Sequence, residues 1–245
     1  IIFLENGDFV EIHDGSYRLF DAELKEVERE IQIIDWEVSE AEKSGHEHFM
    51  YKEILEQAEV IERTITGRVE EDSVEIPISR EQAQKYDKIW IVACGTAYHA
   101  GLFGKDLFEK VLGVPVSVEL ASEFRYREPI VGKNDLGIVI SQSGETMDTI
   151  AATELLKENG SHVLALVNVV GSSLARMADS VFYLHVGPEI GVASTKAYLG
   201  MLVGQLLLAK HWDSKKKLDV SFEEIKGLPL LIAVSYTHLT LPTKA

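Results

Sequence analysis

From residue 73 onward, short apolar runs alternate with segments whose apolar residues recur at helical spacing. Five of these runs are too short for a core helix and are bounded by polar residues or glycine, which is typical of buried strands. The predicted strands are residues 89–93, 116–119, 136–140, 163–168 and 181–184. Four helices are predicted between or after these strands. The first ends near residue 112, the second follows Thr146, and the other two occupy residues 172–178 and 194–212. This alternation predicts an α/β fold with right-handed crossovers and a five-stranded, mostly parallel, doubly wound (flavodoxin-like) sheet.

The loop after the third predicted strand is rich in hydroxyl groups. It has the sequence S-Q-S-G-E-T from Ser141 to Thr146 and leads directly into a helix. Hydroxyls and free backbone N–H groups at the positive end of a helix stabilise an anion, so the loop predicts phosphate capture by Ser141, Gln142, Ser143 and Thr146. The alternative is an ordinary helix N-cap, because serine and threonine are common caps.

Two other connections that leave the predicted sheet also carry small residues. One follows the first strand and the other precedes the last long helix; they are Cys94-Gly95-Thr96 and Val192-Ala193-Ser194-Thr195. Ligands bind beyond the carboxyl ends of the strands in doubly wound sheets. We therefore expect these two connections and the hydroxyl-rich loop to converge on one site.

The first 72 residues have a different pattern. Residues 1–5, 9–13 and 17–20 are β-rich runs separated by Asn-Gly and Asp-Gly pairs, which predicts a three-stranded β-meander. Such a meander is too small to form its own core, so we expect it to be the edge of a larger domain in a longer protein. Apolar positions at helical spacing then predict one amphipathic helix over about residues 47–66.

The net charge of −16 is unevenly distributed. Residues 1–72 contain 21 acidic and 7 basic side chains, a net charge of −14, whereas residues 73–245 carry only −2. The field of the sheet domain therefore does not oppose a phosphate, while the basic patch that nucleic-acid binding needs is missing. No apolar run reaches the length of a membrane span, and a single cysteine fits a reducing cytoplasm. We expect a cytoplasmic protein that binds neither nucleic acid nor membrane.

Several weaker signals have ordinary explanations. Gly95, Gly101 and Glu119 lack the G-x-G-x-x-G spacing of a dinucleotide site, and Glu119 is as easily explained by a local turn. Cys94 is a possible nucleophile, but a cysteine at a strand end is more often a small buried residue.

Two further alternatives concern a lysine and a histidine pair. Lys196 invites comparison with a Schiff-base lysine, yet a surface or salt-bridged lysine is the simpler interpretation. His46 and His48 lack a third metal ligand, so surface residues are favoured over a metal site. No metal and no cofactor is expected.

Four stretches after residue 73 and one at the start of the predicted amphipathic helix resemble a known family. They are C-G-T-A-Y-H-A-G (94–101), E-L-A-S-E-F-R-Y-R (119–127), S-Q-S-G-E-T-M-D-T (141–149), E-I-G-V-A-S-T-K-A-Y (189–198) and H-E-H-F-M-Y-K-E-I-L-E-Q (46–57). They resemble the isomerising glutamine:fructose-6-phosphate aminotransferases, or glucosamine-6-phosphate synthases, over about residues 1–232. The S-Q-S-G-E-T loop alone would indicate any sugar isomerase (SIS) phosphosugar domain.

This resemblance implies a particular domain organisation. Residues 1–36 would be the last strands of a glutaminase domain, 37–72 a helical linker, 73–212 the first SIS domain, and 213–233 the start of the connection to a second SIS domain. The implied partners are the glutaminase domain, the second SIS domain and a second copy of the protein in a homodimer. Residues 234–245 are uncharged until Lys244 and β-rich, and we interpret them as a non-native tail.

The resemblance also implies site residues and their roles. Ser141, Gln142, Ser143 and Thr146 would hold the phosphate of fructose 6-phosphate or glucosamine 6-phosphate; the residues that would line the sugar are Cys94, Gly95, Thr96, Val192 and Ser194. None of these is a catalytic residue, because the family's acid/base, Schiff-base and cysteine nucleophile residues lie in segments that this sequence does not contain. Ala97 stands where the family commonly has serine, and Ala58 where it commonly has proline, so the linker helix is expected to be uninterrupted.

Two other functions are compatible with the hydroxyl-rich loop. A simple phosphosugar isomerase would use the same loop but has no need of the meander and the acidic linker. A sugar-phosphate-sensing regulator would require a basic DNA-binding head in the first 70 residues, where the sequence has β-rich runs and excess acid.

Overall fold

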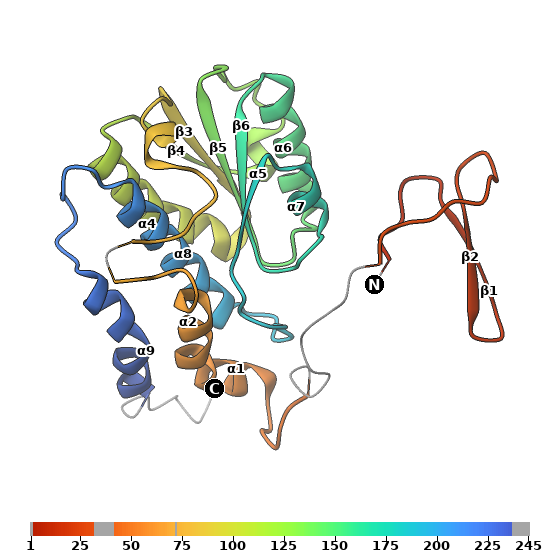
Figure 1. Cartoon of the computed structure of the whole chain (residues 1–245), viewed down its shortest axis with the longest axis horizontal. Helices are drawn as coiled ribbons and strands as arrows, with labels where there is room; N and C mark the ends of the chain where they lie inside the picture. The colour runs from red at the N-terminus through yellow and green to blue at the C-terminus, as the bar shows by residue number, and fades with distance from the viewer. Residues whose placement is uncertain (1, 32–41, 72, 237–245) are drawn as a thin grey trace. The chain divides into compact units, whose positions relative to one another are not determined.

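The protein consists of two compact units, Ile1–Glu37 and Val38–Ala245. The computed structural model describes residues 2–31, 42–71 and 73–236 (Figure 1). Among these residues, no helix combines the length and apolar character that crossing a bilayer requires.

The first unit contains a β-hairpin. Strands β1 (Phe9–His13) and β2 (Ser16–Phe20) pair antiparallel, with Phe9 opposite Phe20 and His13 opposite Ser16. The connecting Asp14 and Gly15 have φ angles of 46° and 78°, as a two-residue hairpin turn with a twist that matches the strands requires. The predicted Asp-Gly turn and the two strands that flank it are therefore confirmed.

The expected first strand of the meander, residues 1–5, is wrong. Ile2 makes only an isolated bridge to Ile31, and Ile1 lies outside the described residues. Instead of extending a ladder, the chain closes a turn in which the Glu5 N–H donates to the Asp8 carboxylate at 2.8 Å and the Asp8 N–H donates to the Glu5 carbonyl at 3.0 Å. Local side-chain bonds of this kind compete with strand pairing.

The linker forms two short helices rather than the expected single one. Helix α1 (Phe49–Leu55) and helix α2 (Gln57–Ile65) meet at Glu56, which keeps helical angles of φ −76° and ψ −10°. The Glu56 N–H donates to the Lys52 carbonyl and the Val60 N–H donates to the Glu56 carbonyl, so helical hydrogen bonds continue across the junction of α1 and α2. The interruption is therefore local, and it falls two residues before Ala58.

The second unit is built on a five-stranded parallel sheet with strand order β4-β3-β5-β6-β7. Its strands are β3 (Lys88–Ala93), β4 (Val116–Leu120), β5 (Asp135–Ser141), β6 (His162–Val167) and β7 (Ser180–Tyr183). All seven residues of β5 are buried, because helices cover both faces of a parallel sheet. The predicted doubly wound fold is confirmed.

Helices cover the two faces of the sheet in separate layers (Figure 1). One core cluster lies under α4 (Gly95–Leu112) and α8 (Lys196–Trp212), with α2, α3 (Arg80–Ala83) and α9 (Phe222–Tyr236) packed around them. The other lies under α5 (Ala121–Phe124), α6 (Met147–Glu158) and α7 (Ser173–Met177). The short helices α3 and α5 were not expected from the sequence.

The chain reverses its direction of strand addition between β3 and β5. From β3 it proceeds outward to β4 and then returns to the other side of β3 to form β5, with Ala93 opposite Ile140. Ligands bind at such a switch point in open α/β sheets. The first and third predicted strand ends therefore lie side by side.

The predicted β-rich character of residues 234–245 is wrong at its start. Residues 234–236 form the last turn of α9, which continues past Pro229 to Tyr236. Helical hydrogen bonding carried over from the preceding turns outweighs the weak strand propensity of three residues. Residues 237–245 lie outside the described part of the chain.

Candidate functional site

A polar pocket opens at the switch point, beyond the carboxyl ends of β3 and β5. Its volume is about 210 Å³, several times the ~30 Å³ that one water occupies in the liquid. The residues that line it come from the end of β5 and the loop after it, from Cys94 and the start of α4, and from α8 and the segment before it: Cys94, Thr96, Ala97, Ile140, Ser141, Gln142, Ser143, Thr146, Ser194 and Met201. The space suits a small polar molecule rather than a single ion.

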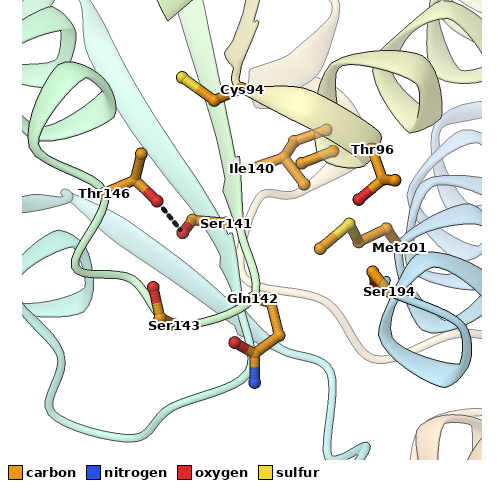
Figure 2. A pocket seen from close by; sticks show the side chains of 10 residues that line it. Cys94, Thr96, Ile140, Ser141, Gln142, Ser143, Thr146, Ser194 and Met201 are labelled. Carbon is orange, nitrogen blue, oxygen red and sulfur yellow. Dashed lines mark hydrogen bonds between the residues drawn. The ribbon is translucent and has the colours of Figure 1, made fainter. Parts of the chain in front are cut away.

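Hydroxyl groups occupy two opposite sides of this pocket (Figure 2). Ser141, Ser143 and Thr146 lie on the side of the loop after β5, and we call them the hydroxyl side. Thr96 and Ser194 lie across the pocket with Met201 and form the helix α4/α8 side. A ligand between them could present an anionic group to one side and hydroxyl groups to the other.

The hydroxyl side is held in shape by its own hydrogen bonds. The Ser141 Oγ accepts from the Gly144 N–H at 3.0 Å and shares a hydrogen bond with the Thr146 Oγ1 at 3.2 Å. The Ser143 Oγ accepts from the Glu145 N–H at 3.2 Å. Because a hydroxyl that accepts a backbone hydrogen bond can still donate its proton, Ser143 remains available as a donor to a ligand. One of Ser141 and Thr146 also keeps its proton, since the bond that they share uses only one of the two.

Gly144 allows the loop to pass close to the start of α7. Its φ of +68° lies in the left-handed region, and a Cβ built on it would meet the Ser172 Oγ at 2.1 Å. Any other residue would therefore suffer both backbone strain and a clash. This glycine keeps Ser141 and Thr146 within hydrogen-bonding distance.

The helix that begins beside the hydroxyl side lacks a side-chain cap. Its N-cap residue is Thr146, whose hydroxyl bonds Ser141 instead of the first turn of α6. The expected alternative, an ordinary N-cap whose side chain bonds the first turn of the helix, is therefore not what the structure shows. The unpaired N–H groups and the helix dipole leave the start of α6 favourable to an anion.

The acidic residues near the pocket are engaged elsewhere. Glu145 accepts hydrogen bonds at 2.7 Å from the N–H and the hydroxyl of Ser173. Asp148 pairs with Arg125 at 2.9 Å. None of the residues that line the pocket in the described part of the chain is charged. An anion would therefore be bound by neutral donors and helix dipoles.

The hydroxyl of Ser194 has no hydrogen-bond partner. Its Oγ is buried and unpaired among the described residues, on the α4/α8 side of the pocket. A buried polar group without a partner costs about 1–3 kcal/mol, so such groups are uncommon in folded proteins. A ligand hydroxyl at this position would remove that cost.

The structure brings most of the predicted site residues together. Seven of the nine line the pocket: Cys94, Thr96, Ser141, Gln142, Ser143, Thr146 and Ser194. Gly95 is the first residue of α4, next to the lining residues, with a φ of +56°. The Val192 side chain is fully exposed and does not line the pocket, because the loop before α8 turns it outward. Whether these residues bind a ligand stays a prediction.

Sequence reasoning missed Ile140 and Met201 as lining residues. Both belong to regular elements, β5 and α8, and both are buried, so their apolar pattern indicates core and not site. Ala97, singled out for its resemblance to a serine position, also lines the pocket and adds a methyl group to it. The walls therefore alternate polar and apolar contacts, as in small-molecule sites generally.

The weaker signals have structural explanations. Lys196 is 2% exposed and its Nζ lies 2.7 Å from the Glu56 carboxylate, so the salt-bridge interpretation is confirmed. Glu119 pairs with Arg127 at 2.5 Å across the turn after β4. Within the described residues, no group of three or more His, Cys, Asp or Glu is placed to hold a metal.

Curated relatives of this chain carry the same name. A glutamine–fructose-6-phosphate aminotransferase (isomerizing) of Clostridium tetani is 48% identical over 241 residues, which is 94% of this chain and 39% of the relative. One from Thermus thermophilus is 43% identical over 230 residues, covering 93% of this chain and 38% of the relative. The chain thus spans about two fifths of the length of the curated relatives that it matches.

Solved structures show the same fold. The C-terminal domain of a glucosamine-fructose-6-phosphate aminotransferase from Francisella tularensis superposes with a TM-score of 0.68 at 37% identity, over 78% of this chain and 55% of that one. The family model of the SIS domain matches residues 83–210, more than half of the chain, and these residues contain all five strands of the sheet and most of α8. The chain therefore belongs to the SIS domain family.

Proposed function

We propose that this chain is the sugar-phosphate-binding part of an isomerising glutamine:fructose-6-phosphate aminotransferase, which makes glucosamine 6-phosphate from fructose 6-phosphate and glutamine. The names of its curated relatives, at 42–48% identity over 85–100% of the chain, support this function over a simple phosphosugar isomerase or a sugar-phosphate sensor. The acidic first unit, with its hairpin, also argues against a DNA-binding head.

In this proposal the two sides of the pocket bind different parts of the ligand. Ser141, Ser143 and Thr146 take the phosphate, together with Gln142 and the free N–H groups of α6. Cys94, Gly95, Thr96 and Ser194 line the sugar. Val192 is left out, because its side chain points away from the cavity.

One observation carries the proposal. A loop with three hydroxyls lies at the uncapped start of α6, in an uncharged pocket that also contains the unpaired Ser194 hydroxyl. Helix starts bind phosphate where their N–H groups are free and where no acid competes. The unpaired hydroxyl across the cavity gives the sugar a place to bind.

The organisation of the whole protein is part of the same proposal. We assign residues 1–36 to the end of a glutaminase domain, 37–72 to the linker, 73–212 to the first SIS domain, and 213–233 to the connection toward a second SIS domain. The other domains and a second copy of the protein would be its partners. The interpretation of residues 234–245 as a non-native tail belongs to the same proposal.

Replacing Ser143 tests the phosphate assignment. Ser143→Ala should weaken fructose 6-phosphate binding by about tenfold or more, since a hydrogen bond to a charged group contributes about 1.5–3 kcal/mol. Binding is measured by titration calorimetry on this chain.

Ser221→Ala is the matched control. The Ser221 Oγ also accepts a hydrogen bond from a backbone N–H, that of Glu224 at 3.1 Å, but it lies at the start of α9, far along the chain from the pocket residues. It should cost about 1 kcal/mol of stability and leave affinity unchanged.

Unphosphorylated fructose separates the two possible roles of Ser143. If the serine binds phosphate, Ser143→Ala should have little effect on the weaker binding of fructose. Equal weakening for both sugars, or a lower melting temperature with unchanged affinity, would show that Ser143 only stabilises the loop and would overturn the phosphate assignment.

A further inference from the structure

The loop that carries Ser194 is fixed by side chains from the linker. This loop, residues 187–195, lies between β7 and α8 and contains no helix or strand. Its backbone N–H groups must therefore find partners outside regular secondary structure. Those partners decide where Ser194 lies in the pocket.

Glu53 of helix α1 supplies the first of these contacts. Its side chain is buried, with 2% of the residue exposed. Its Oε1 accepts hydrogen bonds from the N–H groups of Ile190 at 2.6 Å and Gly191 at 3.1 Å. Carboxylate acceptors make hydrogen bonds roughly twice as strong as neutral ones, so this contact is a firm anchor for the loop.

Gly191 allows the carboxylate to approach so closely. A Cβ built on this glycine would meet the Glu53 Oε2 at 2.5 Å, which is inside contact distance. Its φ is not in the positive region, so the need for glycine comes from the carboxylate and not from the backbone. The loop and the linker helix are thus fitted to one another.

A second contact from the linker lies just after Ser194. The buried Lys196 ammonium pairs with the Glu56 carboxylate at 2.7 Å, and the Glu56 carboxylate also lies 3.4 Å from the Lys52 ammonium. Removing one partner of a buried pair is strongly destabilising, because it leaves a charge without compensation. Ser194 therefore lies between two residues, Gly191 and Lys196, that are both held by the linker.

Glu189, an acidic residue of the loop itself, caps the start of α8. It accepts hydrogen bonds from the N–H groups of Thr195 at 2.8 Å and Ala197 at 3.2 Å. The side chain of Glu189 is thereby used within the loop, and Glu53 is the carboxylate that ties the loop to another element.

We propose that Glu53 is a positioning residue for the sugar side of the pocket: through Ile190 and Gly191 it sets the position of Ser194, although it does not touch the ligand. This inference rests on the proposed function, in which Ser194 contacts the sugar. It also makes the linker and the pocket thermodynamically coupled, because a ligand that favours one loop position must favour the matching position of α1.

The test compares two probes that report on different sides of the pocket. Glu53→Gln keeps the size of the side chain but removes its charge. It should weaken fructose 6-phosphate binding by about tenfold, which corresponds to ~1.4 kcal/mol. Binding of inorganic phosphate, which needs only the hydroxyl side, should be unchanged. Both are measured by titration calorimetry on the full chain.

Control variants separate positioning from a general loss of structure. Glu59→Gln removes a carboxylate from the same linker, where its side chain is 67% exposed and lies 3.8 Å from Arg63. Glu59→Gln should change neither the affinity for fructose 6-phosphate nor the affinity for inorganic phosphate. Gly191→Ala is a second variant, because its added methyl would displace the Glu53 carboxylate; it should reproduce the selective loss for fructose 6-phosphate even if Glu53→Gln fails to fold.

The outcomes distinguish this inference from the proposed function. If Ser143→Ala weakens both probes while Glu53→Gln and Gly191→Ala change neither, the phosphate site stands and the positioning role is overturned. Equal weakening of both probes by Glu53→Gln would also overturn it, since that is the result of a general structural loss. If the unaltered chain binds neither probe, the proposed function fails and this inference fails with it.

Discussion

Ser141 shows what a sequence can and cannot reveal about a single residue. Its position after an apolar run in a hydroxyl-rich loop is visible in the sequence, and so is its suitability for an anion. Its hydrogen bonds to Gly144 and Thr146 are not, because they depend on the left-handed backbone of the loop. The outward orientation of Val192 was unpredictable for the same reason: a loop without periodic structure gives no rule for which side chains face inward.

Two histidines are expected to make stability depend on pH. Burial lowers the pKa of His162 and of His211, so both stay neutral in the folded protein at pH values where an unfolded histidine, with a pKa near 6.5, is protonated. The unfolded state then binds more protons, and the stability that is fully present above about pH 6.5 is lost as pH falls. We expect the melting temperature to decrease between pH 7.5 and 5.5, above the range in which most carboxylates titrate.

A double substitution tests whether His162 and His211 cause this decrease in melting temperature. In His162→Gln/His211→Gln, the glutamine at position 211 can still donate to the Val74 carbonyl that lies 2.7 Å from the His211 Nδ1. The decrease in melting temperature between the two pH values should be clearly smaller in this variant, as followed by circular dichroism. An unchanged decrease would mean that other groups are responsible.

At the scale of elements, the sheet was predictable and the shorter pieces were not. All five strands lie within two residues of their predicted bounds. The three inner strands β3, β5 and β6 give the clearest signal, because strands buried on both faces are continuous apolar runs. Helices α3 and α5 contain four residues each, too few for a periodic signal. The expected first strand is absent because a local bond between Glu5 and Asp8 closes a turn, and Ile2 bridges Ile31 instead of extending the ladder of β1.

The interruption at Glu56 predicts how the linker tolerates proline. Ala58 lies in the first turn of α2, where a proline removes no essential helical hydrogen bond. Ala58→Pro should therefore change the free energy of unfolding by less than about 1 kcal/mol. Glu62→Pro, in the body of the same helix, should cost about 3 kcal/mol or more. Urea denaturation measures both.

Equal destabilisation by the two prolines would contradict this expectation. It would mean that α1 and α2 behave as one continuous helix, with Ala58 in its interior. The structure favours the other outcome, because α2 begins at Gln57 and Ala58 is therefore in its first turn.

At the scale of the molecule, charge and chemistry are separated along the chain. The acidic excess belongs to residues 1–72, and the pocket belongs to the nearly neutral remainder. The linker is the last part of the acidic stretch, and it contacts the loop before α8 through Glu53 and the first residue of α8 through Glu56. The sequence suggested a linker by its charge, but only the fold shows that its buried face is part of the support of the site.

The pocket has groups for binding but lacks groups for the proposed reaction. Forming an amino sugar from a keto sugar requires a proton donor and acceptor and a source of nitrogen. Apart from Cys94, the residues that line the pocket are hydroxyls, an amide and apolar side chains, and the nearby Lys196 is committed to Glu56. We therefore expect this chain alone to make no glucosamine 6-phosphate from fructose 6-phosphate, with either glutamine or ammonia as nitrogen source.

Mass spectrometry of the reaction mixture checks this expectation, and calorimetry shows whether the same sample binds the sugar phosphate. Product above a protein-free blank would place catalytic groups within these 245 residues and would contradict the division between binding here and chemistry elsewhere.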